Sequence, residues 1–418
     1  MNHIEKLLQT LAPKGVEFKK IGELFKRNKG INITAAQMKE LHSEIGKVRI
    51  FAGGATKADI NYKDISKKDI INCESVIIKS RGNIGFEYYN QPFSHKNEIW
   101  SYSSKTNQML VKFLYYYLSN NQDYFQKLAQ SSSVKLPQLS VSDTDEYEVP
   151  VPPLEIQQEI VKILDAFTEL NTELNTELKA RKKQYQYYQN MLLDFNDINQ
   201  NRKDAKERLA QKTYPKRLKT LLQTLAPKGV EFRKLGEVLE YDQPNKYCVT
   251  SKEFDKSYPT PVLTAGKTFI LGYTNEKDNI YQASKNAPVI IFDDFTTATQ
   301  WVDFPFKVKS SAMKILFSKN PTINIRFIFF YMQTIPYNIG GEHARHWISR
   351  YSQLEVPIPP LEIQQEIVKI LDQFSLLTTD LLAGIPAEIK ARKKQYEYYR
   401  EKLLTFKPLT PNKEVDKE

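Results

Sequence analysis

The hydrophobic positions along the chain predict two long helices of nearly identical sequence. Residues 152–165, PPLEIQQEIVKILD, recur unchanged at residues 359–372. The first copy spaces its apolar residues alternately four and three positions apart, at Ile156, Ile160, Ile163, Phe167, Leu170 and Leu174. The second copy repeats this spacing at Ile363, Ile367, Ile370, Phe374, Leu377 and Leu381. Such heptad spacing, following prolines that suit a first helical turn, favours two helices that pack on each other over two core helices of an ordinary domain.

A second duplication extends this repeat to the whole chain. Residues 7–18, LLQTLAPKGVEF, recur at residues 221–232. The first copy overlaps a short amphipathic helix predicted at residues 3–11, which Pro13 and Gly15 terminate. The chain is therefore one unit written twice.

The two segments between the repeated markers, residues 17–150 and 231–357, have the pattern of strands and turns. Short apolar runs such as residues 75–78 and 288–291 are bounded by Gly, Asn, Asp and Ser. The segments align without a gap from Val76 to Phe93 and from Val289 to Phe306, and each then has an aromatic-rich helix candidate, at residues 113–118 and 327–331. We expect one scaffold to underlie both.

A basic, tyrosine-rich cluster follows each long helix, at residues 180–188 and 391–399. The second copy carries extra residues before its cluster, and Gly384 and Pro386 should bend or interrupt that helix. The polar, basic stretch 196–219 is interpreted as a solvated linker rather than a binding arm.

Composition sets outer limits on the function. The net charge of +11 and the pI near 9.2 favour a polyanionic partner. Hydrophobic residues make up 41% of the chain, and no window approaches the ~20 apolar residues of a membrane span, so we expect a folded, soluble protein with no membrane partner. Cys73 and Cys248 have no paired spacing, which predicts a reducing compartment and a cytoplasmic location.

Motifs for chemistry are missing from the sequence. It contains no phosphate-binding P-loop, no glycine-rich dinucleotide turn and no Asn-Pro-Pro motif. The E-x-K matches at residues 17–19 and 388–390 lack an upstream Asp partner, and His343 and His346 are better explained by a polar loop than by a metal site. We therefore predict no catalytic and no metal-binding residues.

Polar side chains that differ between the two copies are the candidates for DNA contact. Residues 80–85 (SRGNIG) occupy the place of residues 293–298 (DDFTTA). Arg can bond guanine, Asn adenine, and Asp can accept from cytosine, so swapped side chains on one scaffold suit two targets. Solvated loop residues are the alternative at each position. The candidates are Ser80, Arg81, Asn83, His95, Lys96, Asn97, Ser132, Lys135, Lys267, Asp294, Thr296, Thr297, Lys309, Arg345, His346 and Arg350.

Two variable segments, each followed by PLEIQQEIVKILD and ARKKQYxYY, resemble the specificity (S) subunit of Type I restriction-modification systems over essentially the full chain. The resemblance implies a DNA-reading subunit with no catalytic residues and no cofactor of its own. Each target recognition domain would read one half of an asymmetric bipartite site in double-stranded DNA. Two methyltransferase (M) subunits that bind S-adenosylmethionine would methylate adenine, and restriction (R) subunits using ATP and Mg²⁺ would cut.

The expected fold is mixed α/β (α+β), with two recognition domains and two long antiparallel coiled-coil helices. We place the first recognition domain at 1–153, its helical spacer at 154–198, a linker at 199–215, the second domain at 216–358, its spacer at 359–407 and a polar tail at 408–418. A stand-alone DNA-binding protein or nuclease and a coiled-coil scaffold that binds only proteins are the alternatives. The scaffold does not explain two duplicated globular segments.

One stretch of the first helix predicts that helix length sets the spacer between the two half-sites: each added repeat unit should lengthen the spacer by about one or two base pairs. Residues 168–178 read TEL-N-TEL-N-TEL, where the second helix has Gly384, Ile385 and Pro386 instead. Each four-residue unit lengthens a helix by ~6 Å. A neutral surface run is the alternative.

Overall fold

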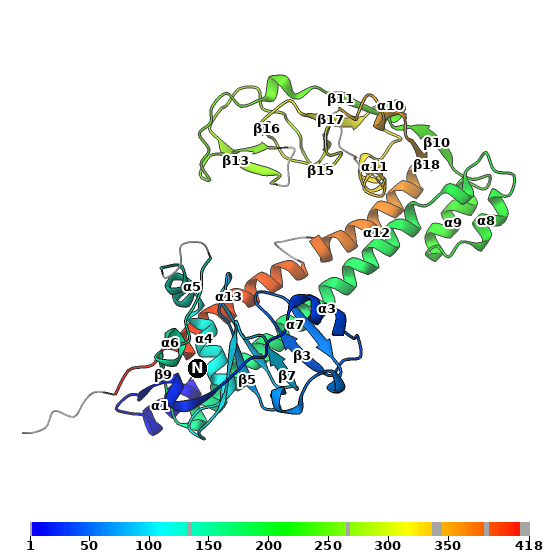
Figure 1. Ribbon diagram of the computed structural model, residues 1–418. Coiled ribbons are helices and arrows are strands. Elements are labelled where there is room, and N and C mark those ends of the chain that lie inside the picture. Colours follow the sequence, from blue (N-terminus) through cyan, green and yellow to red (C-terminus); the bar gives the residue numbers. More distant parts are fainter. Residues whose placement is uncertain (1, 132–135, 265–267, 337–344, 380–383, 410–418) are drawn as a thin grey trace, which may run out of the picture. The chain divides into compact units, whose positions relative to one another are not determined.

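The computed structural model describes residues 2–131, 136–264, 268–336, 345–379 and 384–409 (Figure 1). The chain divides into two compact units, one of Met1–Asn175 with Glu388–Glu418 and the other of Thr176–Ala387. Each unit holds one globular domain of helices and sheets together with parts of the long helices. The predicted mixed α/β fold with two globular domains is confirmed.

The globular domain of the first unit contains two main β-sheets. A four-stranded antiparallel sheet has the order β2-β8-β5-β6, and a three-stranded sheet has the order β4-β3-β7, in which β3 and β7 run parallel. Helix α4 packs on β5, β6 and β8. The elements are α2 Ile21–Leu24, β2 Phe25–Asn28, α3 Ala35–Leu41, β3 Val48–Phe51, β4 Lys57–Ile60, β5 Ser75–Lys79, β6 Gly85–Tyr89, β7 Phe93–His95, β8 Trp100–Ser104, α4 Val111–Asn120, α5 Gln122–Ser131 and α6 Ser142–Asp145.

The domain of the second unit repeats this topology. Its sheets have the orders β11-β17-β14-β15 and β13-β12-β16, again with one parallel pair, β12 with β16. Helix α11 packs on β14 and β15. The elements are α10 Leu235–Val238, β11 Leu239–Asp242, β12 Thr260–Leu263, β13 Ile270–Thr274, β14 Val289–Asp293, β15 Thr299–Val302, β16 Lys307–Val308, β17 Met313–Ser318 and α11 Ile325–Met332. The prediction of one scaffold in both segments is confirmed.

The gap-free alignment of the two copies fails at one turn. In the first domain Lys79 pairs with Gly85, whereas in the second Phe292 pairs with Thr299. The second turn is therefore one residue longer, because six residues (293–298) separate its pairing partners and five (80–84) separate those of the first.

The start of each copy pairs with the strand that precedes the next long helix. Strand β1 (Phe18–Lys20) pairs antiparallel with β9 (Glu148–Pro150), and β10 (Glu231–Lys234) pairs antiparallel with β18 (Glu355–Ile358). The predicted N-terminal helix is α1 (Asn2–Leu11), and its second copy is α9 (Lys216–Leu225). Between the copies lies α8 (Ala205–Gln211).

Long helices lie within both predicted spacers, and the helix of the second spacer is divided. Helix α7 runs unbroken over Leu154–Leu193 and crosses the boundary between the units. The second spacer forms two helices, α12 (Leu361–Thr379) and α13 (Ile385–Leu403). Pro386 lies in the first turn of α13, where its missing N–H leaves no bond unmade. The predicted interruption near Gly384 and Pro386 is confirmed.

The buried side of the helices corrects the predicted seam. Ile156, Ile160 and Leu164 are fully buried in the core of the first domain, whereas Ile163 is only half-buried. The second copy repeats this with Ile363, Ile367 and Leu371. A helix that packs on a broad domain core buries a wide face, which can include successive positions four apart. A two-helix coiled coil buries only a narrow seam, in which spacings of four and three alternate. The motif therefore acts first as a core helix of its own domain, the alternative that the sequence disfavoured.

Polar residues of the duplicated motif also bond to their own domain. Gln157 is fully buried, and its side-chain amide accepts from the Leu110 N–H at 2.8 Å and donates to two carbonyl oxygens. Gln364 makes the equivalent bond with the Asn324 N–H at 2.8 Å. Both amides thus satisfy backbone groups at the start of a packed helix, α4 or α11. The identical sequence of the two copies follows in part from these identical anchoring roles.

Candidate DNA interface

The turn between β5 and β6 carries the first group of predicted DNA contacts. Ser80 is buried, and its hydroxyl donates to the Glu98 carbonyl at 2.6 Å. Arg81 and Asn83 are exposed on either side of Gly82, whose φ of +74° lies in the left-handed region that favours glycine. Ser80 therefore anchors the turn, and Arg81 and Asn83 are the side chains that it presents.

Helix α5 and the segment after it hold this turn by its backbone. The Gly82 N–H donates to the Pro137 carbonyl at 2.8 Å, and the Ile84 N–H donates to the Gln126 side chain at 2.9 Å. Gln122 donates back to the Ile84 carbonyl at 2.9 Å. With the backbone bonded on both sides, the turn is held in place while its two long polar side chains stay exposed.

The second group, at the end of β7, divides into buried and exposed residues. His95 is fully buried and its ring lies 3.2 Å from the Ser101 hydroxyl. Burial lowers the pKa of His95, so its ring is neutral at pH 7. Lys96 forms an ion pair with Glu98 at 3.0 Å, and Asn97 is exposed. The predicted contacts Ser132 and Lys135 lie outside the described residues.

In the second domain Asp294 is buried rather than presented. Its carboxylate accepts the backbone N–H groups of His346 and Trp347 at 3.1 and 2.9 Å. The Lys314 ammonium lies 3.8 Å from the same carboxylate, and burial lowers the pKa of Lys314. Asp294 thus fastens the segment that starts at Arg345 to the β14–β15 turn.

The neighbouring Asp293 organises the turn itself. Its carboxylate accepts the N–H groups of Phe295 and Thr296 at 2.9 and 3.2 Å and the Thr296 hydroxyl at 2.6 Å. Thr297 is buried at a φ of 61°, rare for a β-branched residue. Asp293 and Phe295 are not among the predicted contacts. An Asp followed three residues later by Thr, a pattern that bonds its own backbone, is the signal that points to Asp293.

The remaining predicted contacts of the second domain are mainly exposed. Lys309 lies over the Phe254 ring, 5.4 Å from its centroid, and keeps its side chain exposed. Arg345 and Arg350 are exposed on either side of His346, which is buried. Lys267 lies outside the described residues. Of the residues predicted from sequence, the exposed ones are thus mainly cationic or amide side chains.

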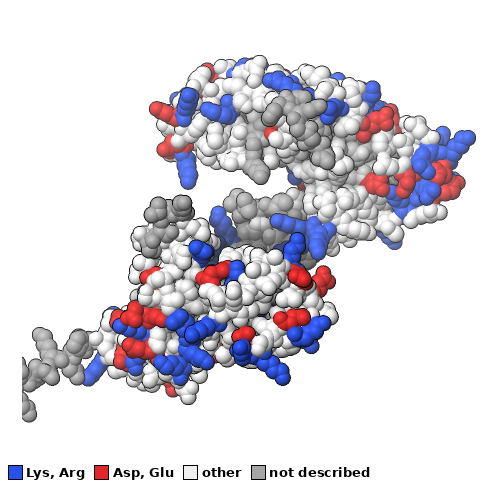
Figure 2. Space-filling model, in the orientation of Figure 1, with Lys and Arg blue, Asp and Glu red and all other residues white. Residues whose placement is uncertain are grey.

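Charge on the molecular surface is mixed. Figure 2 shows Lys and Arg side chains interspersed with Asp and Glu over the face drawn. On this face the basic side chains are thus not gathered in one patch.

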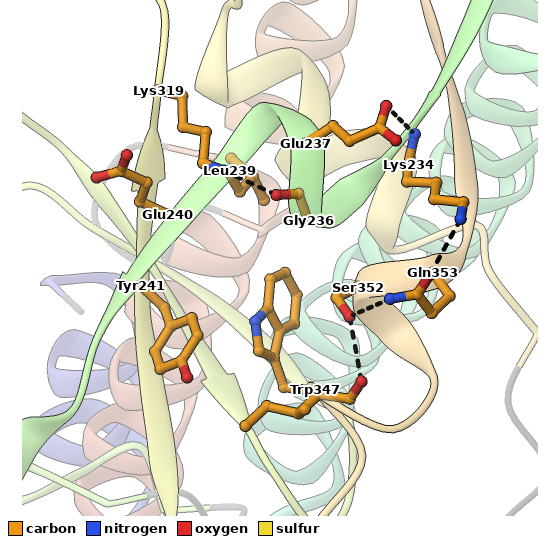
Figure 3. Close-up of a pocket in the computed structure, with 11 residues that line it drawn as sticks. Lys234, Gly236, Glu237, Leu239, Glu240, Tyr241, Lys319, Trp347, Ser352 and Gln353 are labelled. Carbon is orange, nitrogen blue, oxygen red and sulfur yellow. Dashed lines mark hydrogen bonds between the residues drawn. The ribbon is translucent and has the colours of Figure 1, made fainter.

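A pocket of about 640 Å³ opens in the second unit beside β11 (Figure 3). Its polar groups bond among themselves: Lys234 donates to the Gln353 side chain at 3.2 Å, and Lys319 donates to the Gly236 carbonyl at 2.9 Å. None of the predicted DNA contacts lines it. Within the described ranges, no group of three or more His, Cys, Asp or Glu side chains is placed to hold a metal ion, and no helix is long and apolar enough to cross a membrane.

Comparison with known proteins identifies the family. The model of the Type I restriction modification DNA specificity domain matches residues 13–183 and 227–391, one match for each copy of the repeat. The chain belongs to this family.

Similar proteins carry the same family name. The chain is 55% identical over 188 residues to the specificity subunit of the type I restriction enzyme EcoR124I/EcoR124II from Escherichia coli, a match that spans 43% of this chain and 45% of that relative. A putative type I specificity subunit from Haemophilus influenzae is 28% identical over 356 residues, which cover 80% of this chain and 83% of the relative. The crystal structure of an S subunit from M. genitalium has the same fold, with a TM-score of 0.60 at 19% identity over 93% of this chain and 96% of that one.

Proposed function

We propose that this chain is the sequence-reading subunit of a Type I restriction-modification complex, with no catalytic role of its own. Each globular domain reads one half of an asymmetric bipartite DNA site. One observation carries the proposal: two sheets of the same strand order present turns of different sequence and length, β5–β6 and β14–β15. A common scaffold with different turns suits two readers of different sequences, because side chains that contact base edges carry sequence information, whereas phosphate contacts do not.

Within each domain we assign contact to the exposed candidates and positioning to the buried ones. Arg81 and Asn83 would contact bases in the first domain, and Arg345 and Arg350 would contact bases or phosphates in the second. Buried candidates such as Ser80 bond to the protein and would shape the surface. The remaining predicted contacts, and the domain boundaries given above, stay part of the proposal.

Partner subunits would supply the chemistry. We propose that two M subunits, which bind S-adenosylmethionine, assemble on the chain and methylate adenine, and that R subunits bring ATP and Mg²⁺ to cut. The basic clusters at 180–188 and 391–399 would serve this assembly or contact phosphates, and the complex would work in the cytoplasm. Duplicated helices in one chain suit a partner that binds twice.

Methylation mapping tests the proposal. The chain is expressed with its M subunit, and methylated adenines are mapped across a genome. We expect one bipartite motif whose two defined halves flank unspecified bases. Random methylation, or DNA cutting by the purified chain with Mg²⁺ alone, would contradict the proposal.

A further inference from the structure

The polar side chains of the β14–β15 turn hydrogen-bond to groups within the protein. Asp293 accepts three hydrogen bonds from the turn, and Asp294 accepts two backbone N–H groups. The Thr296 hydroxyl donates to Asp293, and the Thr297 hydroxyl donates to the Thr296 carbonyl at 2.6 Å. A donor that is already bonded gains little from a second partner, so these hydroxyls are poor readers of base edges.

Phe295 is the large side chain that this turn leaves exposed. The residue keeps 37% of its surface accessible, between the buried Asp294 and the exposed Thr296. Its backbone N–H is bonded to Asp293 at 2.9 Å, and the turn closes with the Thr297 N–H on the Asp293 carbonyl at 2.8 Å.

The turn is also held in a strained shape. Thr297, a β-branched residue, has a φ of 61°, and such outliers persist where the surroundings over-determine the backbone. The bonds of Asp293 and Asp294 provide that over-determination. A rigid turn that carries an exposed ring presents it at little entropic cost to binding.

Base edges in the major groove offer an aromatic ring one apolar partner, the C5-methyl group of thymine. We propose that Phe295 is a specificity-determining residue of the second recognition domain and reads a thymine by packing against its methyl group. This inference rests on the proposed function. It assigns an apolar contact to the second domain, whereas Arg81 and Asn83 give the first domain polar ones.

The test measures how much the complex of this chain with its M subunits depends on a thymine methyl. Once the site is mapped, duplexes carry deoxyuridine in place of thymidine at one A·T pair at a time. We expect wild type to bind one such duplex about fourfold more weakly, the contribution of roughly one buried methyl-sized group. Phe295→Ala should reduce this ratio to about one and lose the thymine preference at that pair alone.

Controls separate the contact from folding. Leu225→Ala removes an apolar side chain of similar exposure, 41%, from α9 and should keep the fourfold ratio. The Tm of Phe295→Ala should equal that of wild type, because the ring is partly solvated and contributes little to stability. A ratio that stays at four in Phe295→Ala, a wild-type ratio of one at every A·T pair, or equal loss in both half-sites would overturn the inference. If wild type shows no bipartite site at all, the proposed function itself has failed.

Discussion

The Tyr188 ring of α7 stacks on the Phe374 ring of α12, with centroids 5.0 Å apart and planes at 23°. The first unit contains the same pair with the roles exchanged: Phe167 of α7 stacks on Tyr399 of α13, at 5.6 Å and 29°. The two copies of the repeat thus exchange partners: α7 supplies a Tyr to one contact and a Phe to the other, and the second spacer supplies the Phe from α12 and the Tyr from α13. These pairs are where the predicted packing of helix on helix takes place.

The stacked pairs should stabilise the helix contact measurably. Tyr188→Ala is expected to lower the free energy of unfolding by about 2 kcal/mol, from lost burial of a half-buried ring and a lost aromatic pair. Tyr187, which is 62% exposed beside it, is the matched control, and Tyr187→Ala should change stability by less than about 0.5 kcal/mol. Urea unfolding of the three proteins checks this. Equal effects of the two substitutions would show that the stack contributes nothing.

A buried ion pair should make the second unit acid-sensitive. The Lys307 side chain is 2% exposed, and its ammonium lies 2.7 Å from the Glu276 carboxylate. Burial opposes ionisation, but the bonds from Lys307, Ser251 and Thr250 outweigh it and lower the pKa of Glu276 to about 2. Because the pKa of Glu276 in the folded protein lies below its ordinary value of 4.5, this stabilisation is present above pH 4.5 and is lost as pH falls toward about 2.

Glu276→Gln is the variant that tests the pair. It leaves the buried Lys307 with only the exposed Asp278 carboxylate, 3.9 Å away, as a counter-ion, and we expect a loss of about 3 kcal/mol at pH 7. The loss should shrink as pH falls toward about 2, where half of the wild-type carboxylates are protonated. Thermal unfolding at several pH values measures this, and a difference that does not change with pH would rule the pairing out as its cause.

DNA affinity should fall steeply with salt. The net charge of +11 motivates this, because each neutralised phosphate contributes about −0.9 to the slope of log K against log salt. Binding of the complex with M subunits to a duplex is titrated across salt concentrations. A flat response would contradict a surface that follows the phosphate backbone.

Arg81→Ala should weaken reading of one half-site and leave the other intact. A lost bidentate base contact costs roughly 1–3 kcal/mol. Lys105→Ala, another exposed cation of the first unit, is the control and should leave both halves defined. Methylation mapping of both variants measures how well each half-site is still read. Equal degradation of both halves would assign Arg81 to folding or assembly.

Repeat number within 168–178 should set the spacer between the half-sites. The run is helical throughout, and Thr168 and Thr172 each donate to the carbonyl four residues earlier, at 2.8 Å. An added TELN unit can extend the same bonding, lengthening the helix by ~6 Å, which is at most about two base pairs. Variants with one unit more and one fewer are mapped for methylation. An active enzyme whose spacer does not follow repeat number would refute this prediction.

Repetition and periodicity alone determined most of the architecture. Identical segments revealed two copies, short apolar runs marked strands such as β5 and β14, and Gly384 and Pro386 marked the interruption of the second long helix. These signals are local or are repeated in the chain, so one sequence suffices to read them. The family resemblance rests on the same repeats.

Tertiary structure alone decided which predicted contacts are presented. Ser80 and Asn83 look equally suitable in sequence, yet only Asn83 is exposed, because the Ser80 hydroxyl meets a carbonyl eighteen residues away in the chain. Asp294 is likewise fastened to the amides of His346 and Trp347, more than fifty residues away. Burial and long-range hydrogen bonds depend on how distant segments pack, and no local pattern encodes that.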